Sequence, residues 1–214
     1  MFKNNFLVNL FVGFVKITGI FPVLLLFKPR VIRLCKKLPK PCIIVSNHKS
    51  LMDLALYLLI FPFRTVRFLM AEVLFNKGTA FSKFLYALGG IRVDRDAFSF
   101  DFVSNCLEVL DNGGTLGIFP EGRWPVNGKP WPFTVSTAFI ASHATAQIVP
   151  VFTDGNYGIK KSANVVVGEP FDLMQYKKEG LSEEEQLKHL TKVLEEKVYS
   201  LKSKLEEGNS QNAK

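Results

Sequence analysis

The chain has 214 residues, enough for one domain with a sizeable core, and 48% of them are hydrophobic, as in an ordinary globular protein. Its net charge of +8 is unevenly placed, because the first 40 residues hold eight basic side chains and no acidic one. Beyond them the basic residues are balanced by the 19 acidic ones. A neutral body argues against nucleic acid as a partner, whereas basic residues beside an apolar segment indicate an anionic membrane surface.

The apolar segment is FLVNLFVGFVKITGIFPVLLLF, residues 6–27. About 20 apolar residues suffice to span a bilayer, but Lys16 near the centre is costly there, and Gly19 and Pro22 favour a bend. Both a crossing helix and a bent helix in one leaflet therefore fit. No small-residue cleavage site follows, which disfavours a secretory signal. We expect residues 1–40 to be a membrane-associating segment that holds the protein at the cytoplasmic face of the cell membrane.

The sequence contains no spacing typical of metal ligands. Cys35, Cys42 and Cys106 lie in mostly apolar surroundings, which indicates reduced, packed thiols in a cytoplasmic setting. His143 and His189 are isolated, and we expect structural or surface roles for them.

After residue 40, short apolar strands alternate with helical stretches, which predicts an α/β sandwich of helices around a largely parallel or mixed sheet. The last helix has the capping-box spacing at Ser182 and Glu185 and an amphipathic stripe to residue 205. We expect one domain over residues 41–207 and a disordered tail over 208–214. The expected strands are 41–46, 65–71, 91–94, 115–119, 146–152 and 163–171, and the expected helices are 51–61, 79–90, 98–114, 135–145 and 182–205.

A histidine and an aspartate stand where the first of these strands meets the first helix, in the sequence SNHKSLMD. Ser50 is a good N-cap residue and Asp53 follows at the capping-box spacing, so the helix should begin after Ser50. His48 then lies in the loop and can fold back toward the first-turn carboxylate. A carboxylate on one imidazole nitrogen lets the other act as a general base on an alcohol. The alternative is a capping aspartate beside a surface histidine.

Two further stretches, GGIRVDR and GIFPEGRW, place charged groups beside the ends of strands. Arginine is well suited to bind phosphate, because its planar guanidinium matches the geometry of the phosphate oxygens. For each arginine taken alone, a surface ion pair is the alternative. The residues of interest are Arg92, Arg95, Glu121, Gly122 and Arg123.

Taken in order, four stretches resemble the glycerolipid acyltransferases, the 1-acylglycerol-3-phosphate acyltransferase group. NHKSLMD matches the N-H-x-x-x-x-D motif, and GGIRVDR, FPEG and IVPVF resemble the second, third and fourth blocks. The resemblance covers residues 41–155. It implies a membrane-bound α/β enzyme that moves a fatty acyl group from coenzyme A or acyl carrier protein to 1-acylglycerol-3-phosphate, which makes phosphatidic acid in phospholipid biosynthesis.

The resemblance also implies roles for particular residues. His48 would be the general base and Asp53 would orient it, with no protein nucleophile, metal or cofactor, because the thioester is already activated. The arginines would bind the acceptor's phosphate. The acceptor site as a whole would comprise Asn47, Arg92, Arg95, Glu121, Gly122 and Arg123.

Two departures fall where the acceptor's headgroup should bind. The family commonly has E-G-T-R where this chain has EGRW, and often P-F-K-x-G where it has PFTVS. The same chemistry on another lysolipid is therefore an alternative. A hydrolase that uses the same pair to activate water, and a non-enzymatic lipid-binding scaffold, are two further hypotheses.

Overall fold

The computed structural model describes residues 29–94, 101–158 and 161–211, together with positions 10, 13, 14, 17 and 18. Most of the predicted membrane segment 6–27, and Arg95, lie outside the described residues. Among the described residues, no helix has the length and apolar character needed to cross a bilayer.

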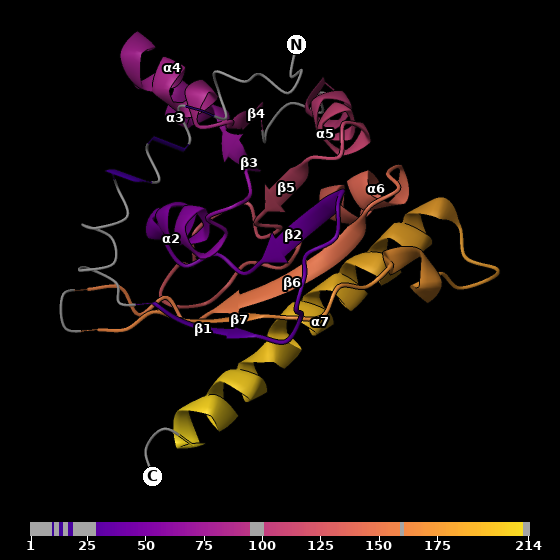
Figure 1. Cartoon of the computed structure of the whole chain (residues 1–214). Helices are drawn as coiled ribbons and strands as arrows, with labels where there is room; N and C mark the ends of the chain where they lie inside the picture. The colour runs from indigo at the N-terminus through magenta and orange to yellow at the C-terminus, as the bar shows by residue number, and fades with distance from the viewer. Residues whose placement is uncertain are drawn as a thin grey trace.

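A seven-stranded mixed sheet forms the centre of the structure, in the order β1-β7-β6-β2-β5-β3-β4 (Figure 1). The five strands from β6 to β4 run parallel to one another, whereas β7 is antiparallel to β6 and pairs in parallel with β1. The strands are β1 (Arg30–Arg33), β2 (Cys42–Ser46), β3 (Val66–Ala71), β4 (Ile91–Val93), β5 (Thr115–Ile118), β6 (Gln147–Thr153) and β7 (Asn164–Val167).

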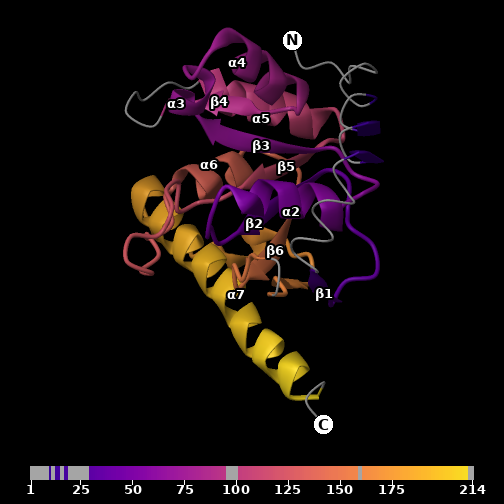
Figure 2. The same ribbon diagram turned by 90° about the vertical axis from the view of Figure 1, so that its left-hand side faces the viewer.

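Helices cover both faces of this sheet, as the two views at right angles show (Figures 1 and 2). Helix α2 lies on one face, and α6 and α7 lie on the other. The predicted α/β sandwich is therefore confirmed. The helices are α2 (Met52–Ile60), α3 (Glu72–Phe75), α4 (Thr79–Ala87), α5 (Asp101–Asp111), α6 (Ser136–Ser142), the 3-10 helix η1 (Leu173–Tyr176) and α7 (Glu183–Gln211).

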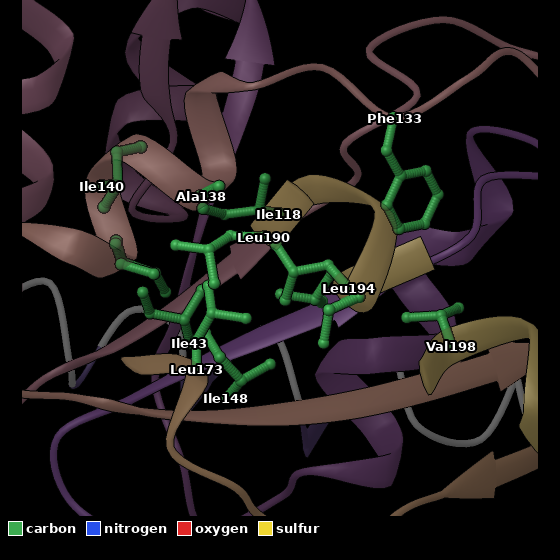
Figure 3. Packing of buried hydrophobic residues seen from close by; sticks show 14 of the residues in the cluster. Ile43, Ile118, Phe133, Ala138, Ile140, Ile148, Leu173, Leu190, Leu194 and Val198 are labelled. Atoms are coloured by element: carbon green, nitrogen blue, oxygen red, sulfur yellow. The ribbon is translucent and has the colours of Figure 1, made fainter. Parts of the chain in front are cut away.

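Each face of the sheet has its own hydrophobic core, because successive side chains of a strand point to opposite faces. In β2, Ile43 and Val45 pack toward α6 and α7, whereas Cys42 and Ile44 pack toward α2. Figure 3 shows the first core, where Ile43 and Ile148 of the sheet meet Leu190, Leu194 and Val198 of α7. Burial on both faces explains why β2 reads as a continuous apolar run. The three cysteines are buried in these cores or beside them.

The C-terminal helix begins with the predicted capping box. The backbone N–H of Ser182 donates to Glu185 Oε2 at 2.9 Å, and Glu185 N–H donates to Ser182 Oγ at 3.4 Å. The helix continues to Gln211, and disorder over 208–214 stays a prediction.

Three elements were not predicted from the sequence: β1, α3 and η1. Strand β1 lies within the basic stretch that was assigned to the membrane segment, yet its residues pair with Asn164–Val167 at the edge of the sheet. Arg33 donates to the carbonyl of Ile60 and lies over the ring of Phe61 at 5.4 Å. Part of the basic cluster is thus bound to the folded body.

Candidate active site

The predicted histidine–aspartate contact is present at the carboxyl end of β2. His48 lies in the loop after the strand, and its Nδ1 is 2.7 Å from Oδ2 of Asp53 in the first turn of α2. The helix begins at Met52, slightly later than the cap at Ser50 predicted, while Ser50 Oγ accepts from the Met52 N–H at 3.0 Å. This offset keeps residues 48–50 non-helical, which allows the imidazole to reach a carboxylate five positions along the chain.

Asp53 is fully buried and its carboxylate is held by several donors. Oδ2 accepts the backbone N–H groups of Lys49 at 2.6 Å and Ser50 at 2.9 Å, in addition to the imidazole. Oδ1 accepts the hydroxyl of Tyr157. Burial and the negative charge of Asp53 raise the pKa of Tyr157, so this hydroxyl stays protonated and donates. Buried carboxylates need such partners, and these fix the plane in which Asp53 meets His48.

Aromatic rings hold the imidazole from two sides. The His48 ring stacks on Phe119 with centroids 4.3 Å apart, and Trp124 stands edge-on at 6.3 Å. The His48 side chain is only 13% exposed. Because Nδ1 is occupied by Asp53, Nε2 is the imidazole nitrogen left to meet a substrate.

Asn47 acts as a clamp between strand ends. Its side chain is fully buried, donates to the carbonyl of Thr153 and accepts the Thr153 N–H, both at 2.9 Å. This pair ties the carboxyl ends of β2 and β6 together immediately before His48. These hydrogen bonds hold Asn47 next to His48, and its part in acceptor binding stays a prediction.

Glu121 also supports the histidine loop. Its Oε1 accepts the backbone N–H of His48 at 3.0 Å and the hydroxyl of Tyr199 at 3.2 Å. Burial raises the pKa of Glu121, and the two hydrogen bonds offset only part of that rise. Gly122 has a φ of +62°, which favours glycine, and its N–H donates to the Phe119 carbonyl at 2.9 Å rather than pointing to an open site.

The predicted phosphate-binding arginines separate into different environments. Arg123 is exposed, lies over the Trp131 ring at 5.6 Å and lines a cavity of about 330 Å³ at the ends of β3 and β4. Glu72, Asn76 and Asp94 line the same cavity. Arg92 is half exposed and forms an ion pair with Glu72.

Sequence reasoning missed several residues that build the site. Tyr157 and Tyr199 come from elements 104 and 78 positions away from the carboxylates they bind, so no local motif could reveal them. Phe119 is the first residue of the FPEG stretch and Trp124 follows that stretch by two positions, so the aromatic residues of GIFPEGRW were a signal that could have been used.

The other histidines bind backbone groups. His143 Nδ1 lies 2.9 Å from the Phe139 carbonyl, and His189 Nε2 lies 2.9 Å from the Tyr176 carbonyl, as expected for structural or surface roles. Among the described residues, no group of three or more histidine, cysteine or carboxylate side chains could hold a metal ion.

Known proteins are similar to this chain in sequence and in fold. A family model described as "Acyltransferase" matches residues 31–154. The 1-acyl-sn-glycerol-3-phosphate acyltransferase beta of Homo sapiens is 29% identical over 113 residues, which are 52% of this chain and 41% of the relative. The alpha enzyme of Homo sapiens is 31% identical over 116 residues, 52% of this chain and 40% of the relative. The chain thus spans about two fifths of the length of these curated relatives.

A solved structure supports the same assignment over more of the chain. The 1-acyl-sn-glycerophosphate (LPA) acyltransferase PlsC from Thermotoga maritima superposes with a TM-score of 0.61 at 25% identity, over 89% of this chain and 78% of that one. The family match covers more than half of the chain, including His48, Asp53 and Glu121. The chain therefore belongs to the acyltransferase family.

Proposed function

We propose that the protein transfers a fatty acyl group from an acyl thioester to the free hydroxyl of 1-acylglycerol-3-phosphate, forming phosphatidic acid. The observation that carries the proposal is the 2.7 Å contact between His48 Nδ1 and the buried carboxylate of Asp53. The relatives' names supply the substrate class, since they are called 1-acyl-sn-glycerol-3-phosphate acyltransferases. The donor is the thioester of coenzyme A or of acyl carrier protein.

In this mechanism His48 is the general base. Its Nε2 takes the proton of the acceptor's hydroxyl while that oxygen attacks the thioester carbonyl carbon. The tetrahedral intermediate then collapses, the C–S bond breaks, and the leaving thiolate takes the proton back from the imidazolium. Asp53 holds Nδ1 and stabilises the imidazolium by its negative charge, a form of base catalysis worth about 10²–10⁴ in rate.

The acceptor's phosphate is assigned to Arg123, which lines the cavity at the ends of β3 and β4. Glu121 holds that loop through the His48 N–H, and Arg123 follows two residues later. The same backbone segment therefore joins the base to the cavity. Arg92 is a weaker candidate, because Glu72 already neutralises it.

A second candidate acceptor follows from the carboxylates of Glu72 and Asp94 in the same cavity. Acidic groups beside Arg123 suit a headgroup that carries a cation next to its phosphate, with Glu72 sharing its charge between that cation and Arg92. The alternative function is thus the same acyl transfer to a zwitterionic lysolipid.

The test supplies detergent-solubilised protein with a labelled acyl thioester and either lysophosphatidic acid, lysophosphatidylethanolamine or no acceptor. We expect labelled phosphatidic acid from wild type and almost none from His48→Ala, whereas His143→Ala should match wild type. Labelled phosphatidylethanolamine in excess would favour the zwitterionic acceptor. Release of free fatty acid without acceptor, or full activity in His48→Ala, would contradict the mechanism.

A further inference from the structure

Both tryptophans of the chain lie in one projecting loop, residues 123–132, here called the tryptophan hairpin. Trp124 is 48% exposed and Trp131 is 40% exposed, and Val126 between them is 57% exposed. The loop belongs to the connection from β5 to α6, which stands out from the body beside α7 (Figure 2). Exposed apolar side chains that are grouped in this way mark interaction sites on soluble proteins.

The hairpin holds these side chains in a fixed arrangement. Val126 and Lys129 exchange backbone hydrogen bonds of 3.3 and 3.0 Å around a turn in which Asn127 and Gly128 both have positive φ. The Trp131 Nε1–H donates to the carbonyl of Trp124 at 3.1 Å. A closed two-residue turn limits the conformational entropy that would be lost when the loop is buried against a partner.

The hairpin itself carries only basic charge, although Glu72 and Asp94 line the cavity that Arg123 borders. Arg123 and Lys129 are basic and exposed, and residues 122–153 contain no aspartate or glutamate. Tryptophan combines an apolar ring with a polar N–H and is enriched at the headgroup level of membranes, while lysine and arginine near the surface are attracted to anionic lipids. This combination fits a bilayer surface rather than an acidic or purely apolar protein.

The hairpin also lies beside the proposed base. Trp124 stands at 6.3 Å from the His48 ring, so one end of the hairpin borders the site. Other exposed apolar side chains follow strands at the same edge: Leu51 and Met52 come after β2, and Val73 comes after β3. The carboxyl edge of the parallel strands therefore presents an apolar rim around the site.

We propose that the tryptophan hairpin docks on an anionic phospholipid bilayer and places the carboxyl edge of the sheet, with His48, against the membrane surface. The acceptor could then enter the site without leaving the lipid phase. The inference rests on the proposed function only in taking the acceptor to be a lipid.

Intrinsic fluorescence tests this docking directly, because the only tryptophans of the chain are Trp124 and Trp131. The full-length protein is mixed with vesicles of phosphatidylglycerol and phosphatidylcholine, with and without bromine-labelled phosphatidylcholine. We expect emission to shift to shorter wavelength and to be quenched by the brominated lipid, in Trp124→Phe and Trp131→Phe as in wild type. Co-sedimentation with unshifted, unquenched emission would overturn the proposal, because another segment of the protein would then contact the membrane. Failure of the protein to co-sediment with the vesicles would also overturn it.

A charge variant at the tip adds a quantitative test. Lys129→Gln removes one exposed basic group and should weaken binding to these vesicles about fivefold, the effect of one lysine near an anionic surface. Lys202→Gln on α7, whose side chain is 64% exposed, is the matched control and should bind as wild type. Equal binding by both variants would contradict the proposal. A tryptophan shift produced by monomeric lysolipid alone would also overturn it, because the loop would then report acceptor binding. None of these readouts requires acyl transfer, so they remain informative if the proposed function fails.

Discussion

The two halves of the carboxyl edge are built differently. Around β2 and β6, the polar groups of Asn47, His48 and Asp53 bind one another or nearby backbone, and two of these three side chains are fully buried. Around β3 and β4, charged groups line an open cavity, with Arg123 exposed and Arg92 in a surface ion pair. Under the proposed function, the first half would carry the proton transfer and the second would bind the acceptor's headgroup. Substitutions in the first should therefore lower kcat, and those in the second should raise KM.

The largest expected effect is that of Asp53→Asn. An amide cannot hold the imidazole in the same tautomer or support its positive charge, and the same change in the serine-protease triad costs about 10⁴ in kcat. Steady-state acyl transfer, with circular dichroism to check the fold, measures it. Asp154→Asn, in a neighbouring loop that binds Asn164, is the control and should retain activity. Equal loss in both variants would contradict a specific role for Asp53.

Tyr157→Phe should have the next largest effect. It removes the hydroxyl that donates to Asp53 Oδ1, and a hydrogen bond to a charged group contributes about 1.5–3 kcal/mol. We expect kcat to fall about 10- to 100-fold at unchanged acceptor KM, because Tyr157 positions Asp53 without touching the substrate. Tyr86→Phe, at a tyrosine that is 40% exposed, provides the control. A rise in KM at constant kcat would assign Tyr157 to substrate binding instead.

The arginines of the second half should differ from each other. Arg123→Ala should raise the KM for lysophosphatidic acid about tenfold or more, since it removes a charge-assisted contact to phosphate. Arg92→Ala should raise it about threefold or less, because Arg92 already pairs with Glu72 at the surface. Initial rates over a range of acceptor concentrations measure both. A larger rise in KM for Arg92→Ala than for Arg123→Ala would instead assign the phosphate to Arg92 on β4.

The smallest expected effect concerns stability and pH. The pKa of Glu121 is raised in the folded protein, so the fold binds this proton more tightly than the unfolded chain does. Stability from this group is fully present below the unfolded pKa and is lost as pH rises through the raised folded value. Glu121→Gln should remove that loss. Unfolding midpoints of wild type and Glu121→Gln, measured between about pH 4 and about pH 7, test this. The stability of wild type relative to the variant should fall as the pH rises. A constant difference would show that Glu121 does not titrate in this range.

Local patterns predicted the parts of the molecule that depend on neighbouring residues. The run PCIIV gave β2, and the loop position of His48 followed from the expected helix start near Ser50. The spacing in HKSLMD then predicted the contact between His48 and Asp53, because a histidine in the loop before a helix can fold back to a carboxylate in the first helical turn. The capping box of α7 was likewise local.

Long-range partners could not be read in this way. Tyr157 reaches Asp53 only because β6 lies beside β2 in the sheet, and the sequence does not specify strand order. For the same reason, strand β1 and the antiparallel direction of the predicted strand β7 escaped prediction. The pairing of Arg92 with Glu72 escaped it as well. From the sequence, Arg92 was a candidate for binding phosphate, but in the fold it pairs with Glu72, which follows the neighbouring strand β3.

The most direct test of the account is a double-variant cycle on His48 and Asp53, measured as the rate of phosphatidic acid formation from lysophosphatidic acid and an acyl thioester. If Asp53 acts only through the imidazole, the double variant His48→Ala with Asp53→Asn should be no slower than His48→Ala alone, as is found when residues act as one unit. Additive losses would show that the two residues act separately. Wild-type activity in His48→Ala would exclude His48 as the base.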